Sequence, residues 1–157
     1  MQFSLPFAAP EINRDAASET GGDALGNLPE WNLDDLYTGE DAPELESDMA
    51  WLETNCAKFA TDYAGKLDGL SAADMLACIE LQEEINQKAG RIMSYAGLRY
   101  YQNTMDAGRA QFMQNCQETL TDYTGHLVFF SLEFNRLNED HLVSLLAENT
   151  DLARYKP

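Results

Sequence analysis

A regular stripe of apolar residues between Asp106 and Leu137 constrains the fold of this chain more than any other feature. Its members recur at alternating spacings of three and four: Met113, Cys116, Leu120, Tyr123, Leu127, Phe130, Phe134 and Leu137. Residues at these spacings share one side of a helix, so the stripe predicts a single long helix over 106–137. Around residues 128–134 nearly the whole circumference is apolar. Burying each such side chain is worth about 1.5–3 kcal/mol, so we expect the short last helix, a second copy of the chain or both to cover this end.

A second stripe of the same kind predicts an earlier long helix. It consists of Leu45, Met49, Leu52, Cys56, Phe59 and Tyr63. Asp41 is the expected cap, because Pro43 suits the first turn and Glu44 completes a capping box. Gly65 follows the last member of the stripe and is the expected end of the helix.

Between these two helices, Ser71 and Asp74 have the spacing of a capping box and predict a helix from residue 72 to about 101. Gly90 and Gly97 lie near one face of it, and each costs up to about 1 kcal/mol relative to alanine. We therefore expect a neighbouring helix to approach closely at both glycines. The second half of the helix is almost wholly apolar or aromatic, so buried hydroxyl groups that need partners are expected on Tyr95, Tyr100 and Tyr101.

The connections between these helices determine the predicted fold class. Residues 102–105 form a short link, which forces the helices before and after it to run antiparallel. Asn138 starts a shorter helix that reaches about Asn149, and residues 28–37 suggest a helical turn that is held by one large aromatic residue. No strand-like alternation is present. The prediction is an all-α, up-and-down bundle-like lobe with three long antiparallel helices and short ones.

The sequence also predicts how the chain is divided into domains. Residues 1–27 lack periodicity and are rich in small residues, so they are interpreted as a flexible leader. Residues 28–157 form one helical domain, because a chain of 157 residues is too short for two comfortable domains. The sequence stops at Pro157 without a helix end signal, as expected for a chain that continues.

Composition excludes several classes of partner. The sequence has 27 acidic and 10 basic residues, a net charge of −17, which makes nucleic acid and anionic membranes poor partners. It has no run of about 18 apolar residues and no basic, then apolar, N-terminal signal. Cys56, Cys78 and Cys116 are an odd number of thiols without C-x-x-C spacing. They are interpreted as reduced core residues of a cytoplasmic protein.

No reactive constellation is evident in the chain. Glu80, Glu83 and Glu84 are interpreted as a solvated acidic face, because a di-metal bundle also needs E-x-x-H pairs and none occurs. His126 and His141 are the only histidines; neither is part of H-E-x-x-H, and His126 is expected at a helix surface or core edge. The residues therefore assign no catalytic, cofactor-binding or metal-binding position.

Four stretches nevertheless resemble one protein family in the correct order. They are LPEWNLDDLY at 28–37, FATDYAGKL at 59–67, SYAGLRY at 94–100 and FFSLEFNRL at 129–137. Together they resemble the N-terminal helical region of the oligoendopeptidase F family, which is a group of thimet-oligopeptidase-like zinc metallopeptidases. The resemblance covers roughly residues 28–157 and does not reach the family's H-E-x-x-H helix.

The resemblance implies a non-catalytic lobe of a zinc-dependent peptidase. Such a lobe would wall one side of a substrate channel and restrict access to short oligopeptides, whereas zinc and catalysis would belong to a C-terminal domain missing from this chain. The chain alone is therefore expected to be inactive, and its exposed apolar surface would favour the catalytic domain or a homodimer as a partner. A self-contained helical adaptor that binds a partner helix is the alternative.

Overall fold

The computed structural model describes residues 31–156, so the leader expected at 1–27 lies outside the described residues. The described residues from 32 onward form a compact unit of their own, and the fold below is that of this unit. Its elements are α1 (Pro43–Tyr63), η2 (Leu67–Gly69), α2 (Ala72–Gln102), α3 (Ala107–Gly125), α4 (Val128–Phe134), α5 (Glu139–Glu148) and η3 (Leu152–Tyr155). The described residues contain helices and no strand, which confirms the predicted all-α class.

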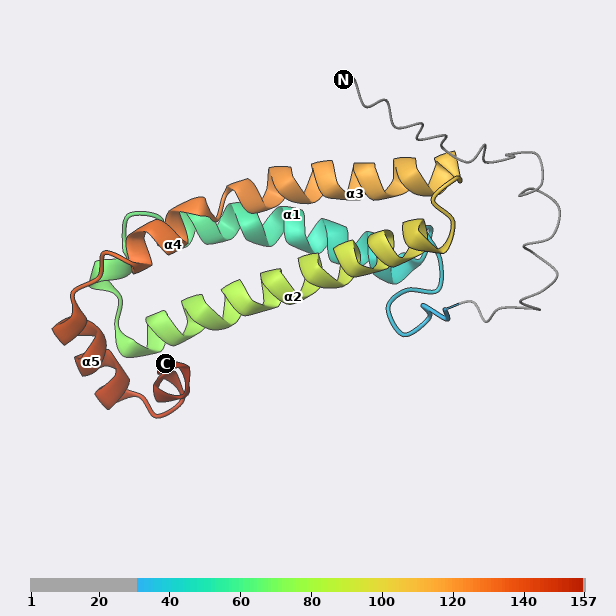
Figure 1. Cartoon of the computed structure of the whole chain (residues 1–157). Coiled ribbons are helices and arrows are strands. Elements are labelled where there is room, and N and C mark those ends of the chain that lie inside the picture. Colours follow the sequence, from blue (N-terminus) through green and yellow to red (C-terminus); the bar gives the residue numbers. More distant parts are fainter. Residues whose placement is uncertain (1–30, 157) are drawn as a thin grey trace, which may run out of the picture. The chain divides into compact units, whose positions relative to one another are not determined.

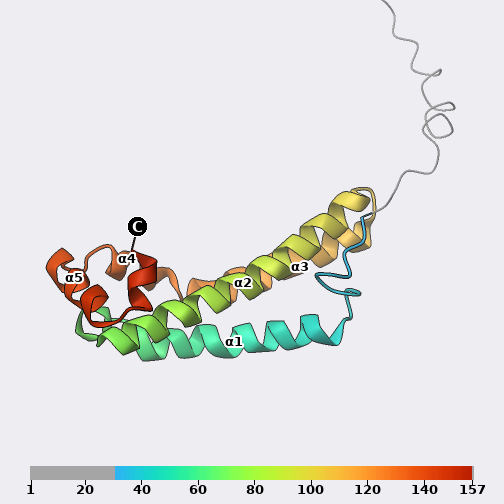
Figure 2. The same cartoon turned by 90° about the horizontal axis from the view of Figure 1, so that it is seen from below.

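The helices α1, α2 and α3 run antiparallel in succession and each packs against the other two (Figure 1). Between them lies a core of fully or almost fully buried side chains: Leu52, Cys56, Phe59, Cys78, Ile85, Ile92, Cys116 and Leu120. Figure 2 shows α1 along one side of the α2–α3 pair, while α5 and η3 lie on another side at one end of α2. A second, smaller core forms there from Ala72, Met75, Leu145 and Leu152.

Several predicted helix ends are confirmed. The Ser71 hydroxyl accepts a hydrogen bond from the Asp74 backbone N–H at 3.1 Å, so the cap of α2 is as expected. Asn138 caps α5 by accepting from the backbone N–H groups of Asp140 and His141. Gly65 adopts a positive φ of 74° just after α1, a conformation that favours glycine and ends the helix.

The predicted cap of α1 is wrong by one residue. The N-cap is Ala42, which has extended backbone angles and makes no side-chain capping bond. Pro43 explains the difference, because the residue before a proline is pushed out of the helical region and the helix can start only at the proline itself. Asp41 therefore lies one position too early to cap.

The single helix predicted over 106–137 is also wrong, because it is divided at His126 and Leu127 into α3 and α4. The Leu127 N–H donates to the Thr124 carbonyl oxygen at 2.9 Å, so bonds between residues three apart replace the helical pattern. Gly125 has a low helix propensity, and the Thr124 hydroxyl bonds back to the Leu120 carbonyl at 2.7 Å, which favours a bend. The apolar stripe itself still faces inward across the break.

The cover expected over residues 128–134 is only partial among the described residues. No side chain of α4 is fully buried, and Val128 and Leu132 are 61% and 56% exposed. The last helix, α5, packs mainly against α2 and η3, and only Phe134 of α4 packs on the second core, which contains Leu145 of α5. The apolar pattern predicted more burial than the structure shows, because α4 is short and only the side of it that bears Phe129 and Phe130 packs on Phe59 of α1.

Neither glycine of α2 is explained by a close neighbouring helix, which contradicts the prediction. A β-carbon placed on Gly90 would meet no atom within 4 Å, and one placed on Gly97 would meet only the Tyr101 ring at 4.0 Å. The expectation for the tyrosines is also wrong in part, since Tyr101 is 63% exposed whereas Tyr95 is buried.

We expect Gly90→Ala to raise the free energy of unfolding by up to about 1 kcal/mol, because alanine restricts the unfolded chain and nothing opposes its methyl group. Urea unfolding followed by circular dichroism measures the change. Gly65→Ala is the matched control, and it should destabilise the protein because residue 65 has a positive φ. A Gly90→Ala variant less stable than the parent would contradict the absence of packing at this site.

Candidate functional site

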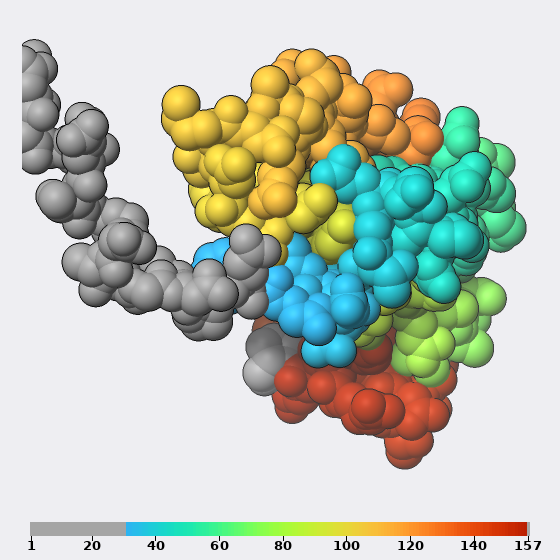
Figure 3. All heavy atoms as spheres, turned by 90° about the vertical axis from the view of Figure 1, so that its right-hand side faces the viewer, coloured from blue at the N-terminus to red at the C-terminus, as the bar shows by residue number. Residues whose placement is uncertain are grey.

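Residues 33–42, called the strap, hold a buried tyrosine against α1. Tyr37 is only 3% exposed, and its hydroxyl donates a hydrogen bond to Asp48 Oδ2 at 2.7 Å. Its ring meets that of Tyr95 edge to face at 5.4 Å. The strap occupies one end of the bundle, beside the turn between α2 and α3 (Figure 3). Trp31, the largest aromatic side chain of residues 28–37, is 58% exposed, and Tyr37 is the buried one.

Asp48 is the centre of this cluster and the only buried charged residue among those described. Lys88 of α2 lies 2.6 Å from Asp48 Oδ1, and Arg91 lies 3.6 Å from Oδ2. Arg91 also donates to the Leu36 carbonyl oxygen, and its guanidinium lies 4.3 Å from the centre of the Tyr37 ring. The strap, α1 and α2 are thus joined by one polar network.

The surroundings of Asp48 and Tyr37 hold each of the two side chains in one protonation state. Burial alone would raise the pKa of Asp48, but hydrogen bonds from Lys88 and Tyr37 and the nearby positive charges hold it below its ordinary value of 3.8. For Tyr37, burial first and then the Asp48 carboxylate raise the pKa well above the ordinary value of 10.0. Asp48 therefore stays ionised and Tyr37 stays protonated at neutral pH, which suits anchoring and not proton transfer.

The sequence contained a signal for this cluster that its apolar patterns concealed. Asp48 lies three residues after Leu45 and four before Leu52, so it occupies an inward position of the α1 stripe. Lys88 has the same relation to Ile85 and Ile92 in α2. Opposite charges at inward positions of two neighbouring helices favour a buried ion pair.

The acidic and histidine side chains that could have formed a metal site do not lie together. Among residues 31–156 no three histidine, cysteine or acidic side chains are placed to hold a metal ion. Glu80, Glu83 and Glu84 are exposed on α2, and Glu83 accepts a hydrogen bond from the Tyr155 hydroxyl at 2.7 Å. His126 is exposed at the end of α3, at the helix surface as expected, and His141 belongs to α5.

The three cysteines are buried, free thiols, as predicted from their apolar positions. Burial raises the pKa of the Cys78 thiol to about 12 and, together with the charge of Glu40, that of Cys116 to about 11. Burial also raises the pKa of Cys56. Because the thiolate is the reactive form, these thiols are packing residues at neutral pH and not nucleophiles.

The second distinctive feature is a pair of exposed apolar side chains on α4. Val128 and Leu132 lie one turn apart on this helix, and Val143 of α5 is also 60% exposed. We call Val128 and Leu132 the apolar ridge. The helix that bears it is held in place, because the Glu133 carboxylate accepts a hydrogen bond from the Gly65 N–H at 2.9 Å. The inner side of α4 packs its phenylalanines on Phe59.

A third feature is a hollow of about 420 Å³ between α2 and α3. It is lined by Ala89, Gly90 and Met93 of α2 and by Gln117, Leu120, Thr121 and Thr124 of α3. No residue of α1 and no charged residue lines it. Gly90 is exposed at its edge, so the missing side chain of this glycine leaves part of the space open.

Comparisons with known proteins found no match that would indicate a function for this chain. No protein-family model, curated protein sequence or solved structure matches the chain. Within residues 31–156, no helix combines the length and the apolar character that crossing a membrane requires. The three features above are therefore the basis for any functional proposal.

Proposed function

We propose that this chain is the non-catalytic N-terminal lobe of an oligoendopeptidase F-like, zinc-dependent peptidase of the cytoplasm. In this proposal the lobe walls one side of a substrate channel and restricts access to short oligopeptides. Hydrolysis of the peptide bond, with zinc as the Lewis acid, belongs to a catalytic domain that this chain does not contain. The four family-like stretches in their order support the assignment.

The observation that carries the proposal is the apolar ridge. A self-contained domain gains stability by burying such side chains, yet Val128 and Leu132 are each more than half exposed. The ridge begins next to the stretch at 129–137, which is one of the four that resemble the family. A further domain that packs on α4 would account for both facts.

The charged and thiol side chains also support a lobe that restricts access to the substrate channel and carries no reactive group. Asp48 is paired with Lys88 and Arg91, and the three thiols are buried. Shape and surface charge are the remaining means of selecting a substrate. A helical adaptor remains the alternative, because an exposed ridge also fits a partner protein.

Purified, zinc-loaded chain should show no hydrolysis of internally quenched oligopeptides above the buffer rate, because no metal-ligand set is present among the described residues. Hydrolysis that copurifies with the chain through successive columns would overturn the assignment as non-catalytic. The same preparation should bind an apolar dye through the ridge.

A pair of variants tests whether the ridge is the exposed apolar surface. Leu132→Glu should reduce both dye binding and self-association, because it places a charge on the ridge. Ser131→Glu is the matched control, since it adds the same charge to an exposed position of α4 and removes no apolar side chain. Equal effects of the two variants would contradict a role for the ridge.

A further inference from the structure

The strap is attached to the three long helices by side chains and not by its backbone. The N–H groups of Leu36 and Tyr37 donate to the Leu33 carbonyl oxygen at 2.8 and 3.1 Å, so these hydrogen bonds stay within the strap. Among the described residues, no hydrogen bond joins the backbone of residues 33–41 to the backbone of α1, α2 or α3. The strap can therefore detach without breaking the hydrogen bonds of any helix, and its local opening should cost less than unfolding of the core.

One side chain provides most of the attachment. Tyr37 is the only buried residue between 33 and 41, and its hydroxyl group and ring contact Asp48 and Arg91. A second polar contact joins Glu40 of the strap to Arg99 of α2 at 3.3 Å, and both of these side chains are 35% exposed. Because exposed ion pairs contribute little to stability, the contacts of Tyr37 should dominate the cost of opening.

The site that receives the Tyr37 side chain is built from α1 and α2 alone. We call it the socket; its members are Asp48 of α1 and Lys88, Arg91 and Tyr95 of α2. Lys88 lies 2.6 Å from Asp48 Oδ1, and this ion pair does not involve the strap. When Tyr37 leaves, the Asp48 carboxylate keeps a charged partner, so the open form avoids the large cost of an unpaired buried charge.

We propose that the strap is a latch that opens and closes as one unit over a three-helix core that stays folded, and that Tyr37 in the socket holds it closed. Opening uncovers the Tyr95 ring and the Asp48 carboxylate at the end of the bundle beside the turn between α2 and α3 (Figure 3). Phenylalanine at position 37 would fill the socket but leave Asp48 without a hydroxyl donor, so the closed form depends on tyrosine. The latch goes beyond the proposed lobe function and does not depend on it.

Limited proteolysis with a glutamate-specific protease measures the opening, because Glu40 lies in the strap and cleavage needs a locally unfolded chain. Tyr37→Phe should raise the rate of cleavage after Glu40 about tenfold, since it removes one buried hydrogen bond to a charged acceptor. Cleavage after Glu53 of α1 and Glu84 of α2 should keep the rate of the parent protein. Mass spectrometry of the fragments identifies each cut.

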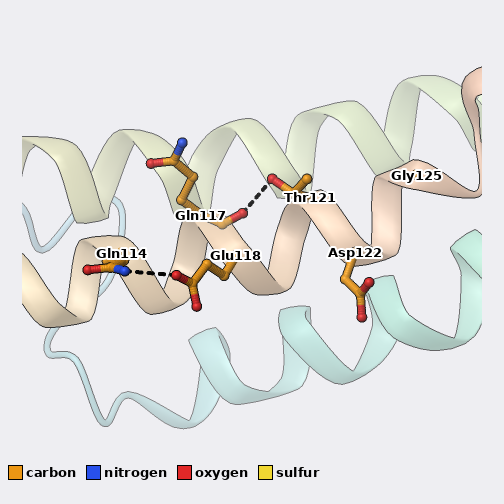
Figure 4. Close-up of a pocket in the computed structure, with 6 residues that line it drawn as sticks. All are labelled: Gln114, Gln117, Glu118, Thr121, Asp122 and Gly125. Atoms are coloured by element: carbon orange, nitrogen blue, oxygen red, sulfur yellow. Dashed lines mark hydrogen bonds between the residues drawn. The ribbon is translucent and has the colours of Figure 1, made fainter.

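The matched control is Thr121→Val on the outer face of α3. The Thr121 hydroxyl donates to the Gln117 carbonyl oxygen at 2.7 Å, so its hydrogen bond stays within one helix (Figure 4). This variant also removes a hydroxyl group, but it should leave cleavage after Glu40 unchanged. The latch would be overturned if Tyr37→Phe were cleaved there no faster than the control, or if cleavage after Glu53 increased by the same factor.

Hydrogen exchange of the parent protein tests the same inference without a substitution. The strap amides of Tyr37 and Ala42 should exchange faster than those of Ile85 and Ile92, which are fully buried core residues. Low concentrations of urea should accelerate exchange of the core amides more than that of the strap amides, because opening of the strap exposes less surface. Equal protection and equal urea dependence of the two pairs would mean that the strap opens only when the core unfolds, and this result would overturn the latch.

Discussion

Replacing Asp48 with alanine is expected to lower the free energy of unfolding by about 3 kcal/mol, because breaking a buried ion pair leaves its partners uncompensated. Tyr37 loses the acceptor of its hydroxyl, and Lys88 and Arg91 lose their shared carboxylate. The partial exposure of the two basic side chains keeps the loss near the lower end of the usual range. Urea unfolding at neutral pH measures the change.

The pH dependence provides a second measurement of the same interaction. Because the pKa of Asp48 is lowered in the folded protein, its contribution to stability is present above the ordinary value of 3.8 and is lost as pH falls below that value. Stability should therefore decrease more steeply on acidification in the parent than in Asp48→Ala. Glu84→Ala, at an exposed position of α2, is the control and should change stability by less than about 0.5 kcal/mol. A loss in Asp48→Ala as small as the control's would contradict a central role for the network.

Phe59→Ala is expected to destabilise the protein by about 3–5 kcal/mol, which is typical of a large cavity in a core. Phe59 is fully buried, and its ring contacts Tyr63, Phe129 and Phe130 at centroid distances of 5.0, 5.7 and 5.6 Å. The loss of local stability should be largest in α4, because two of these three contacts attach that helix to α1. Hydrogen exchange should show faster opening of residues 128–134 than of α2.

A control for this prediction is Tyr101→Ala, which truncates an aromatic residue that is 63% exposed and should have a much smaller effect. Uniform loss of exchange protection over α1, α2 and α4 in Phe59→Ala would contradict a separate attachment of α4. Retained stability within about 1 kcal/mol of the parent would contradict the assigned core.

The long elements could be predicted because their apolar residues repeat with the helical period. The stripes from Leu45 to Tyr63 and from Met113 to Leu137 both face inward, and Ser71 and Asn138 start their helices as expected. The division at His126 was not predictable from the stripe, since apolar spacing continues through it. It depends on local competition for backbone hydrogen bonds by Thr124.

The candidate sites were harder to predict because they depend on contacts between distant residues. The network at Asp48 joins positions 11 and 40 residues away, and the hollow at Gly90 exists only because α3 packs beside α2. A glycine in the middle of a helix can mark either a close contact with a neighbouring helix or an open groove, and the two look the same in the sequence. Only the packed structure, which gives the exposure of each glycine, distinguishes the two cases.

We propose that this chain is one lobe of a larger zinc peptidase. Determining the coding sequence that follows Pro157 tests it most directly. We predict that the reading frame continues into a second domain that contains H-E-x-x-H and a downstream glutamate, the ligands of a catalytic zinc. A stop codon directly after Pro157, or a continuation without such a motif, would contradict the proposed function and favour the helical adaptor.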